Sequence, residues 1–412
     1  MIHSTKRRLI FGLAALLLLV SASFAAGEGK KPGPQTTVIL LSMDGVRWDY
    51  PLRDHLSAFA DMARTGVHAD RLTPEFPSLT FPDHAALATG CFPGKNGIIA
   101  NAFRDPATGR YFSRSKSASW LLEPPLWVLA ERSGIETAVC AWPVSSGPWH
   151  SVRPEIYRSY RDDKGDFDTL RWIEELLRKP AAQRPGLIMA WTHGADHPGH
   201  EEGPDGPSVH AAMRRENRLL TRLLKAIRSR PSHQRVVLIV VSDHGMSPVA
   251  ERLRVRDWVA KRHYFPFIAT SGPICNIYVK GQKQRTAVGE ELARLPAAVM
   301  AWPRGALPER FHYTGSGRVG DFVLLARPGA TFASYYTKPG SPVVKGMHGY
   351  DPRLKDMGGI FYAVGPNIAR GKRLKRASMV DVAPTICRLL HIPPPPDADG
   401  AALPVSTASK RP

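Results

Sequence analysis

Cysteine is scarce in this chain, and its few cysteines are not arranged to hold a metal ion. The 412 residues include four of them, and no two have the C-x-x-C spacing of a zinc site. A cysteine-based metal cluster is therefore excluded. Export would permit disulfides, with three possible pairings, but buried free thiols fit the sequence equally well. The four are Cys91, Cys140, Cys275 and Cys387.

Long apolar runs are absent except near the N-terminus, where a short one follows a basic stretch. Basic residues at positions 6–8 precede the run Leu9–Val20, and Ser23 and Ala25 then have the spacing that a signal peptidase requires. The run is too short to span a membrane comfortably, and no cysteine near the cleavage site could carry a lipid. We therefore predict a signal peptide over residues 1–25, export to the periplasm or out of the cell, and no stable membrane anchor.

Blocks of one charge and internal repeats are absent as well. The formal net charge is +20, but arginine and lysine are dispersed instead of gathered in short basic runs interleaved with aromatic residues. A specific nucleic-acid partner is therefore not expected. The proline run Pro393–Pro396 opens a polar end, and we expect residues 393–412 to form a loosely ordered tail.

What the sequence does contain is an alternation of short apolar runs and amphipathic stretches. Continuous apolar runs are typical of strands buried on both faces of a parallel sheet. The alternation predicts an α/β fold with a mostly parallel central sheet and helices on both faces. The predicted strands are Val38–Met43, Thr137–Trp142, Leu187–Thr192, Val236–Ser242 and Phe361–Val364, and the predicted helices are Leu52–Arg64, Leu121–Arg132, Phe167–Arg178, Val209–Arg228 and Met379–Leu390.

The predicted domain extends from residue 26 to residue 392. Within it, residues 251–342 contain short β-like pieces, Asn276–Val279 and Asp321–Leu325. We interpret this segment as a smaller α+β lobe, inserted before the last candidate metal-binding histidine, that helps to wall the pocket.

Three acids follow predicted strands, at the edge where ligands bind in sheets of this type. Asp44 follows the first strand, Asp243 follows Val236–Ser242, and Asp196 comes a short loop after Leu187–Thr192. One carboxylate in such a place is usually a helix cap or a turn residue. Three of them at equivalent strand ends favour a metal site.

Three histidines accompany these acids: His244 beside Asp243, His200 in D-H-P-G-H, and His348 in K-G-M-H-G-Y-D. Imidazole and carboxylate ligands suit Zn²⁺, and six such residues make two sites of three ligands, each with an open position. Pro198 and Gly199 predict a tight loop, not a regular helix, before His200.

Two further histidines leave the exact ligand set open. His193, His197 and His200 form an H-x-x-x-H-x-x-H series that could itself hold one metal ion. Spacing alone does not decide between this series and the mixed sets of acids and histidines.

Thr80 lies in the stretch F-P-S-L-T-F-P-D-H, directly before a helix-like run. Proline is tolerated in the first helical turn, so Pro82 predicts the start of that helix, with Thr80 at its N-terminus. Free N–H groups and the helix dipole suit an anion there. An isolated threonine at such a place is usually a cap, but the six candidate ligands favour a nucleophile.

These motifs, in this order, resemble the nucleotide pyrophosphatase/phosphodiesterase family of the alkaline phosphatase superfamily. The similarity extends from M-D-G at Met43 to D-V-A-P-T at Asp381, which is most of the chain after the predicted signal peptide. The motifs that carry it are T-F-P-D-H, T-G-C-F-P-G-K-N-G-I, W-P, R-P-E-I-Y, D-H-P-G-H-E-E-G-P, S-D-H-G-M and M-H-G-Y-D.

The resemblance implies a role for each matching residue. Thr80 would be the nucleophile and would contact one of two Zn²⁺ ions. Asn101 and the backbone N–H of Phe81 would support the phosphate, and Phe81 and Tyr157 would flank a nucleobase. One zinc would be held by Asp44, Asp243 and His244, and the other by Asp196, His200 and His348.

The implied reaction is hydrolysis of a small-molecule phosphodiester or phosphoanhydride through a covalent phosphothreonine, releasing a nucleoside 5′-monophosphate. No basic residue near Thr80 stands out in the sequence as the extra clamp that a monoesterase needs, and no C/S-x-P-x-R motif points to sulfate esters. The alternatives are a phosphomonoesterase or phosphonate hydrolase on the same two metals, or an inactive metal- or nucleotide-binding protein. The sequence leaves the physiological substrate and the oligomeric state open.

Overall fold

The structure, a computed structural model, describes residues 36–162, 164–231, 235–259, 265–334, 337–338 and 340–407. The predicted signal peptide lies outside these described residues. Everything described belongs to one compact unit, residues 34–412. Among the described helices, none combines the length and the apolar character that crossing a membrane requires.

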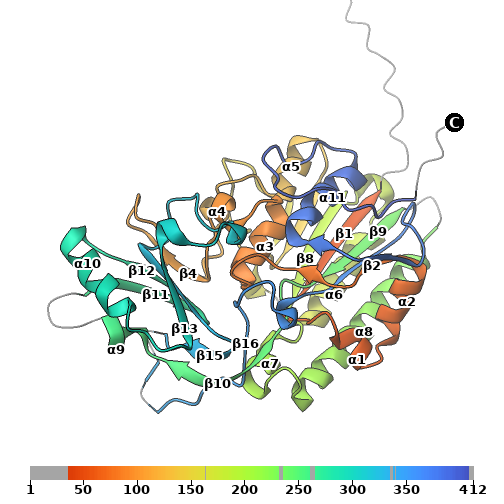
Figure 1. Ribbon diagram of the computed structural model, residues 1–412. Helices are drawn as coiled ribbons and strands as arrows, with labels where there is room; N and C mark the ends of the chain where they lie inside the picture. The colour runs from red at the N-terminus through yellow and green to blue at the C-terminus, as the bar shows by residue number, and fades with distance from the viewer. Residues whose placement is uncertain are drawn as a thin grey trace, which may run out of the picture. The chain divides into compact units, whose positions relative to one another are not determined.

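An eight-stranded sheet forms the centre of this unit (Figure 1), in the order β18–β2–β17–β9–β1–β8–β6–β7. Neighbours from β9 to β7 pair in parallel, and β17 alone pairs antiparallel with both of its neighbours. The sheet is thus mostly parallel, as predicted. Its strands are β1 Thr37–Met43, β2 Val67–Ala69, β6 Thr137–Cys140, β7 Ile156–Arg158, β8 Leu187–Thr192, β9 Val236–Val241, β17 Phe361–Val364 and β18 Lys372–Leu374.

Helices cover both faces of this sheet, which confirms the predicted layers. Every residue of β1, β8 and β9 is buried, because alternate side chains enter two different cores. Val38 and Leu40 belong to one core and Ile39 and Leu41 to the other. The first core also contains residues of α3 Thr80–Thr89, α5 Leu126–Arg132 and α11 Val382–Leu390, and the second contains residues of α2 Ser57–Thr65, α6 Asp166–Arg178 and α8 Pro207–Arg228.

Two predicted helices are shorter than the apolar pattern indicated. The stretch Leu52–Arg64 is interrupted at His55, whose φ of 52° lies in the left-handed region, so that α1 Tyr50–Arg53 and α2 are separate. The stretch Leu121–Arg132 begins its helix only at Leu126, because Pro125 precedes it as an extended N-cap.

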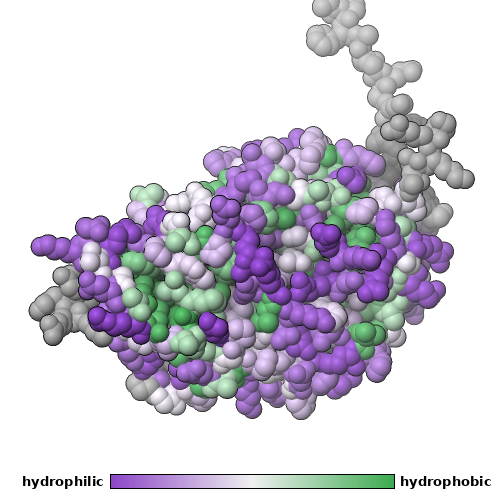
Figure 2. Space-filling model, viewed as in Figure 1, coloured by the Kyte–Doolittle hydropathy of each residue, from purple (hydrophilic) through white to green (hydrophobic). Residues whose placement is uncertain are grey.

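The smaller lobe predicted over residues 251–342 has a sheet and a core of its own. Its four antiparallel strands lie in the order β11–β12–β14–β13, with bounds β11 Phe267–Ser271, β12 Ile274–Tyr278, β13 Val299–Pro303 and β14 Phe322–Ala326. Helices α9 Val255–Val259 and α10 Gly281–Leu292 contribute to the same core. Figure 2 shows a hydrophobic patch over this lobe, whereas hydrophilic residues cover much of α2 and α8.

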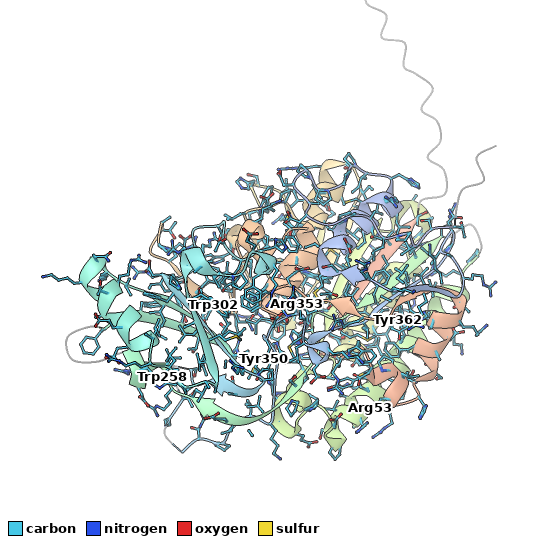
Figure 3. All side chains as sticks on the ribbon, viewed as in Figure 1. Arg53, Trp258, Trp302, Tyr350, Arg353 and Tyr362 are labelled. Carbon is cyan, nitrogen blue, oxygen red and sulfur yellow. The ribbon has the colours of Figure 1, made fainter. Side chains whose placement is uncertain are left out.

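A three-stranded sheet in the order β15–β10–β16 links the lobe to the rest of the unit. Its strands are β10 Ser247–Leu253, β15 Gly329–Phe332 and β16 Gly346–Met347. Tyr350, labelled in Figure 3, follows β16, and its buried hydroxyl donates a hydrogen bond to the carbonyl oxygen of Ala330 on β15 (2.9 Å). The chain therefore returns from the lobe along a fixed path.

The expected loose tail is packed over its described part, residues 393–407. Leu403 and Val405 are buried, the backbone N–H of Ala401 donates to Asp381 Oδ1 (2.9 Å), and Ser406 forms a bridge with Ile368. Apolar residues after the proline run thus extend the core beside α11, which the polar composition of this end concealed. All four cysteines are buried and unbridged, so the thiol alternative holds.

Candidate active site

The three acids meet at one edge of the central sheet because their strands are adjacent and in register. Ser42 pairs with Val241 and Met43 pairs with Thr192, which places the ends of β1, β8 and β9 level with one another. The backbone N–H of Gly45 donates to Asp243 Oδ1 (3.0 Å). Asp44, Asp196 and Asp243 therefore lie together, as the strand-end argument predicted.

The segment carrying Asp196 and His200 is a helix, α7 Asp196–Glu202, where a loop was expected. Pro198 lies in the first turn, where its missing N–H needs no partner, so it does not break the helix. The helix places the two side chains one turn apart on the same face. His200 Nε2 lies 3.3 Å from Asp196 Oδ1.

The six predicted ligands form two adjoining clusters. In the first, Asp44, Asp243 and His244, one ligand atom from each residue lies within 4.8 Å of the others, with His244 Nε2 at 3.2 Å from Asp243 Oδ2 and 3.6 Å from Asp44 Oδ1. The second comprises Asp196, His200 and His348, in which Asp196 Oδ1 lies 3.3 Å from His200 Nε2 and 3.4 Å from His348 Nε2. The ligand atoms that all lie within 4.8 Å of one another on this side are those of Asp196, His348 and His244, so His244 is shared between the clusters. The rings of His244 and His348 stack at 3.5 Å, so the clusters touch.

All three histidines are held by their Nδ1 atoms. A backbone carbonyl can only accept, so the Nδ1–H group of each ring is the donor. His200 donates to Gly346 O (2.9 Å), His244 to Gly245 O (3.0 Å) and His348 to Ser78 O (3.0 Å). In the neutral form of each ring, the Nε2 lone pair then faces its cluster. Burial lowers the pKa of His348 to about 3, which keeps that ring neutral.

One oxygen of each of the three carboxylates has no hydrogen-bond donor among the described residues. These oxygens are Asp44 Oδ1, Asp196 Oδ1 and Asp243 Oδ2, and all three are buried. Burial and the charges of Asp243 and Asp196 raise the pKa of Asp44 well above its ordinary value. Unsatisfied buried oxygens of this kind are costly unless a cation binds them, so the donor set fits divalent metal binding.

Thr80 stands beside the first cluster. It is the first residue of α3, two residues before the start that Pro82 indicated, and its Oγ1 lies 3.2 Å from His244 Nε2. The buried ring of His84 holds the backbone of Thr80, since His84 Nδ1–H donates to the carbonyl oxygen of Thr80 (2.7 Å). His84 is therefore a positioning residue that the sequence reading missed.

A cavity of about 1020 Å³, here called the main cavity, opens in front of Thr80 and both clusters. The backbone N–H of Phe81 donates to Asn101 Oδ1 (3.1 Å), and both residues line the cavity. Tyr157 is not among its lining residues. Tyr160, three positions further, lines it instead.

The remaining histidines of the series point to other partners. His193 Nδ1 lies 2.8 Å from Asp166 Oδ1, and His197 Nε2 lies 3.3 Å from Glu201 Oε1 on the exposed side of α7. Among the described residues, no member of the series belongs to a group whose ligand atoms all converge within 4.8 Å, and His200 alone has its Nε2 atom beside an acid of the clusters, Asp196. The geometry therefore favours the mixed clusters over the H-x-x-x-H-x-x-H series.

Five lysine and arginine residues line the main cavity with Thr80, contrary to the expectation that no basic residue stands near it: Arg114, Lys116, Lys164, Arg171 and Arg215. Arg114 and Lys116 follow β5 Tyr111–Ser113, in a segment without regular structure. Lys116 Nζ lies 5.1 Å from the ring centroid of Phe81 and 4.3 Å from that of Tyr160. Trp191 was also missed; its Nε1–H donates to Asp44 Oδ2 (2.9 Å).

Comparison with known proteins agrees with this geometry. The family model for type I phosphodiesterase / nucleotide pyrophosphatase matches residues 38–351, which carry both clusters and Thr80. The chain belongs to this family. Membership shows that the chain is a phosphoric diester hydrolase, and the fold is that of the alkaline phosphatase superfamily.

Similar proteins cover most of the phosphodiesterase. An uncharacterized pyrophosphatase/phosphodiesterase of Schizosaccharomyces pombe is 29% identical over 93% of this chain and 82% of its own length. The human ectonucleotide pyrophosphatase/phosphodiesterase family member 5 is 28% identical over 93% of this chain and 78% of its own length. Venom phosphodiesterase 2 of Crotalus adamanteus is 28% identical, and the match covers 46% of that longer protein.

Solved structures confirm the fold of the phosphodiesterase. The human ectonucleotide pyrophosphatase/phosphodiesterase 5 superposes with a TM-score of 0.81 at 26% identity, covering 89% of this chain and 97% of that one. The murine protein, in an inactive form complexed with AMP, gives 0.80 at 27% identity and covers 88% of this chain and 96% of that one.

Proposed function

We propose that this chain is an exported two-zinc phosphodiesterase and nucleotide pyrophosphatase that uses Thr80 as its nucleophile. The observation that carries the proposal is the convergence of three buried carboxylate oxygens without hydrogen-bond donors and three imidazole Nε2 atoms beside the Thr80 hydroxyl. Small-molecule nucleotides are the proposed substrates, because a structural relative was solved with AMP.

Each cluster would hold one zinc ion, the first with Thr80 as an additional ligand. When bound, zinc would lower the pKa of a hydroxyl that it contacts and neutralise charge on phosphate oxygens. The Nδ1 hydrogen bonds of His200, His244 and His348 keep their Nε2 atoms available for this role.

The chain's own residues perform the bond changes and hold the phosphate. Thr80 Oγ1 loses its proton to solvent and bonds to phosphorus, and the phosphorus–oxygen bond on the opposite side breaks with its electron pair on the leaving group. Water then hydrolyses the resulting phosphothreonine and releases a nucleoside 5′-monophosphate. The Nδ2 group of Asn101 would stabilise the phosphate oxygens, and the backbone N–H of Phe81, which donates to Asn101 Oδ1, would join it when substrate binds.

The retained nucleobase would lie between Phe81 and Tyr160. Both rings line the main cavity, and the Lys116 ammonium lies near both of them. Base stacking on aromatic side chains tolerates different bases, so this pair of rings would bind the nucleoside without strict base selection.

The proposed location and domain division rest on the sequence. Residues 1–25 would direct export to the periplasm or the exterior, and residues 26–392, together with the packed end to residue 407, would form the enzyme. The smaller lobe would wall one side of the cavity.

Zinc analysis of the purified protein and incubation with ATP test the proposal. We expect two zinc ions per chain and the products AMP and pyrophosphate. Thr80→Ala should lower kcat by at least about 10³-fold, as loss of a nucleophile does in other hydrolases, while Thr80→Ser should retain part of it.

Three outcomes would contradict the proposal. Stepwise release of orthophosphate would indicate a monoesterase. A wild type that stays inert with added zinc would indicate a binding protein. Full turnover by Thr80→Ala would show that Thr80 is not the nucleophile.

A further inference from the structure

A second, smaller cavity adjoins the main cavity at the metal clusters. This side cavity, of about 290 Å³, lies toward the smaller lobe, where β11 packs beside β4 Ala102–Arg104 (Figure 1). The N–H of Ala102 donates to Ser271 Oγ on β11 (2.9 Å), which fixes the wall. Four residues line both cavities: Asn101, Arg114, His200 and His348.

The side cavity meets only one of the two clusters. His200 and His348 of the second cluster line it, whereas Thr80 and the first cluster line or adjoin the main cavity alone. In an in-line displacement, the nucleophile and the leaving group lie on opposite sides of phosphorus. With Thr80 beside the first cluster, the leaving group departs toward the second cluster and therefore toward the side cavity.

The chemistry of the side cavity suits an anion. The main cavity has four aspartates in its wall, but no carboxylate is found among the described residues that line the side cavity. Hydroxyl groups and one guanidinium take their place. These polar residues are Tyr111, Ser113, Arg114, Thr270, Ser271 and Ser334.

Arg114 is positioned at the junction and its charge is available. Its φ of 48° lies in the left-handed region, and its N–H donates to the carbonyl oxygen of Asn101 (2.8 Å). A left-handed conformation is strained in an arginine, and strained residues cluster at binding sites. Within the described part of the chain, its exposed guanidinium has neither an ion pair nor a hydrogen bond with a carboxylate.

From these observations we propose that the side cavity is the leaving-group subsite and that Arg114 binds a phosphate of the leaving group there. The inference rests on the proposed function and narrows its substrate class. The enzyme then prefers substrates whose leaving group is itself a phosphate, such as nucleoside triphosphates and dinucleotide polyphosphates. Diesters that release a neutral or cationic alcohol gain nothing from this arginine.

Lys116 provides the internal contrast. It lies two residues further along the same segment, but it contacts Phe81 and Tyr160 in the main cavity and is not among the residues of the side cavity. The two cations therefore serve different halves of the substrate, Lys116 the retained nucleotide and Arg114 the departing group.

A pair of substrates with the same retained half tests the proposal. TTP and p-nitrophenyl thymidine 5′-monophosphate both leave thymidylate on Thr80, but only TTP releases a phosphate-bearing group. Arg114→Asn removes the charge and keeps a residue that tolerates the left-handed conformation. We expect it to lower kcat/KM for TTP by about 10- to 100-fold, the effect of a lost charge-assisted hydrogen bond. The kcat/KM for the p-nitrophenyl ester should change by less than about threefold.

Three further measurements complete the design. Arg114→Lys should recover part of the TTP activity, and product inhibition by pyrophosphate should weaken in Arg114→Asn while inhibition by thymidylate does not. Arg110→Ala, an exposed arginine of the same hairpin outside both cavities, should leave both substrates unchanged.

Equal losses on both substrates, or no loss on either, would overturn the assignment of Arg114. An inactive wild type, or an active Thr80→Ala, would instead overturn the proposed function itself, so the two failures are distinguishable.

Discussion

Gly45 and Asp196 touch through their backbones: a β-carbon added to Gly45 would stand 2.7 Å from the Cα atom of Asp196. Gly45 also has a φ of +67°, in the left-handed region. The end of β1 and the start of α7 can therefore meet only because this position lacks a side chain. The contact brings the first and second clusters together.

Gly45→Ala should displace Asp196 and weaken the second cluster. We expect a loss of about 2–4 kcal/mol in the free energy of unfolding, combining backbone strain with the clash, and about one zinc ion per chain in place of two. Gly109→Ala is the matched control, because Gly109 has a similar φ of +70° and nothing within 4 Å of its added carbon. If the two variants lose equal stability and keep all zinc, the contact has no such role.

His348→Ala should remove one metal ion and leave the first cluster loaded. His348 supplies an Nε2 atom to the second cluster only, so zinc content should fall from two to about one per chain. Elemental analysis after gel filtration measures this directly. His391→Ala, an exposed histidine after α11, should keep both ions. Retention of two tightly bound ions by His348→Ala would contradict the ligand assignment.

Glu75 should make the fold less stable as the pH rises. Burial raises the pKa of Glu75 from its ordinary value of 4.5 to about 8, although Ser378 Oγ donates to its Oε1 (2.8 Å). Between these two values, the unfolded chain has lost a proton that the folded protein retains. Stability therefore falls with rising pH across this window, by up to about 1.4 kcal/mol per pH unit.

Glu75→Gln should remove this dependence. Urea unfolding at pH 5 and pH 8 should show similar stability at the lower pH and a more stable variant at the higher pH. The exposed Glu155→Gln serves as control and should follow the wild type. Parallel curves for Glu75→Gln and the wild type would show that Glu75 does not titrate in this range.

The cysteines should be unreactive in the folded protein. All four are buried and unbridged, and burial raises the pKa of Cys91 and Cys387 to about 12. N-ethylmaleimide should add nothing under native conditions and four groups in urea, as counted by intact mass. A reductant should leave Tm unchanged, and a drop in Tm would reveal a disulfide.

The metal clusters could be predicted because they depend on regular structure. Asp44 and Asp243 follow strands whose apolar runs are plain in the sequence, and adjacent parallel strands end at one edge of the sheet. Histidines next to those strand ends, such as His244, follow from the same argument. The sequence does not indicate the helix at Asp196, because proline usually breaks a helix and only the structure shows that Pro198 lies in the first turn.

The substrate pocket could not be predicted in the same way. The motif R-P-E-I-Y-R-S-Y contains two tyrosines, and only the three-dimensional path of the chain shows that Tyr160, and not Tyr157, lines the cavity. Arg114 and Lys116 come from a segment without periodicity, whose path is set by one left-handed residue. No local pattern indicates where such side chains point.

The place of His348 in the chain has a consequence for biosynthesis. Asp44, Asp243 and His244 all precede the smaller lobe, whereas His348 follows it. A ribosome therefore completes the first cluster before the lobe and the second only after it. A chain that ends before residue 348 would carry all three residues of the first cluster and lack one residue of the second.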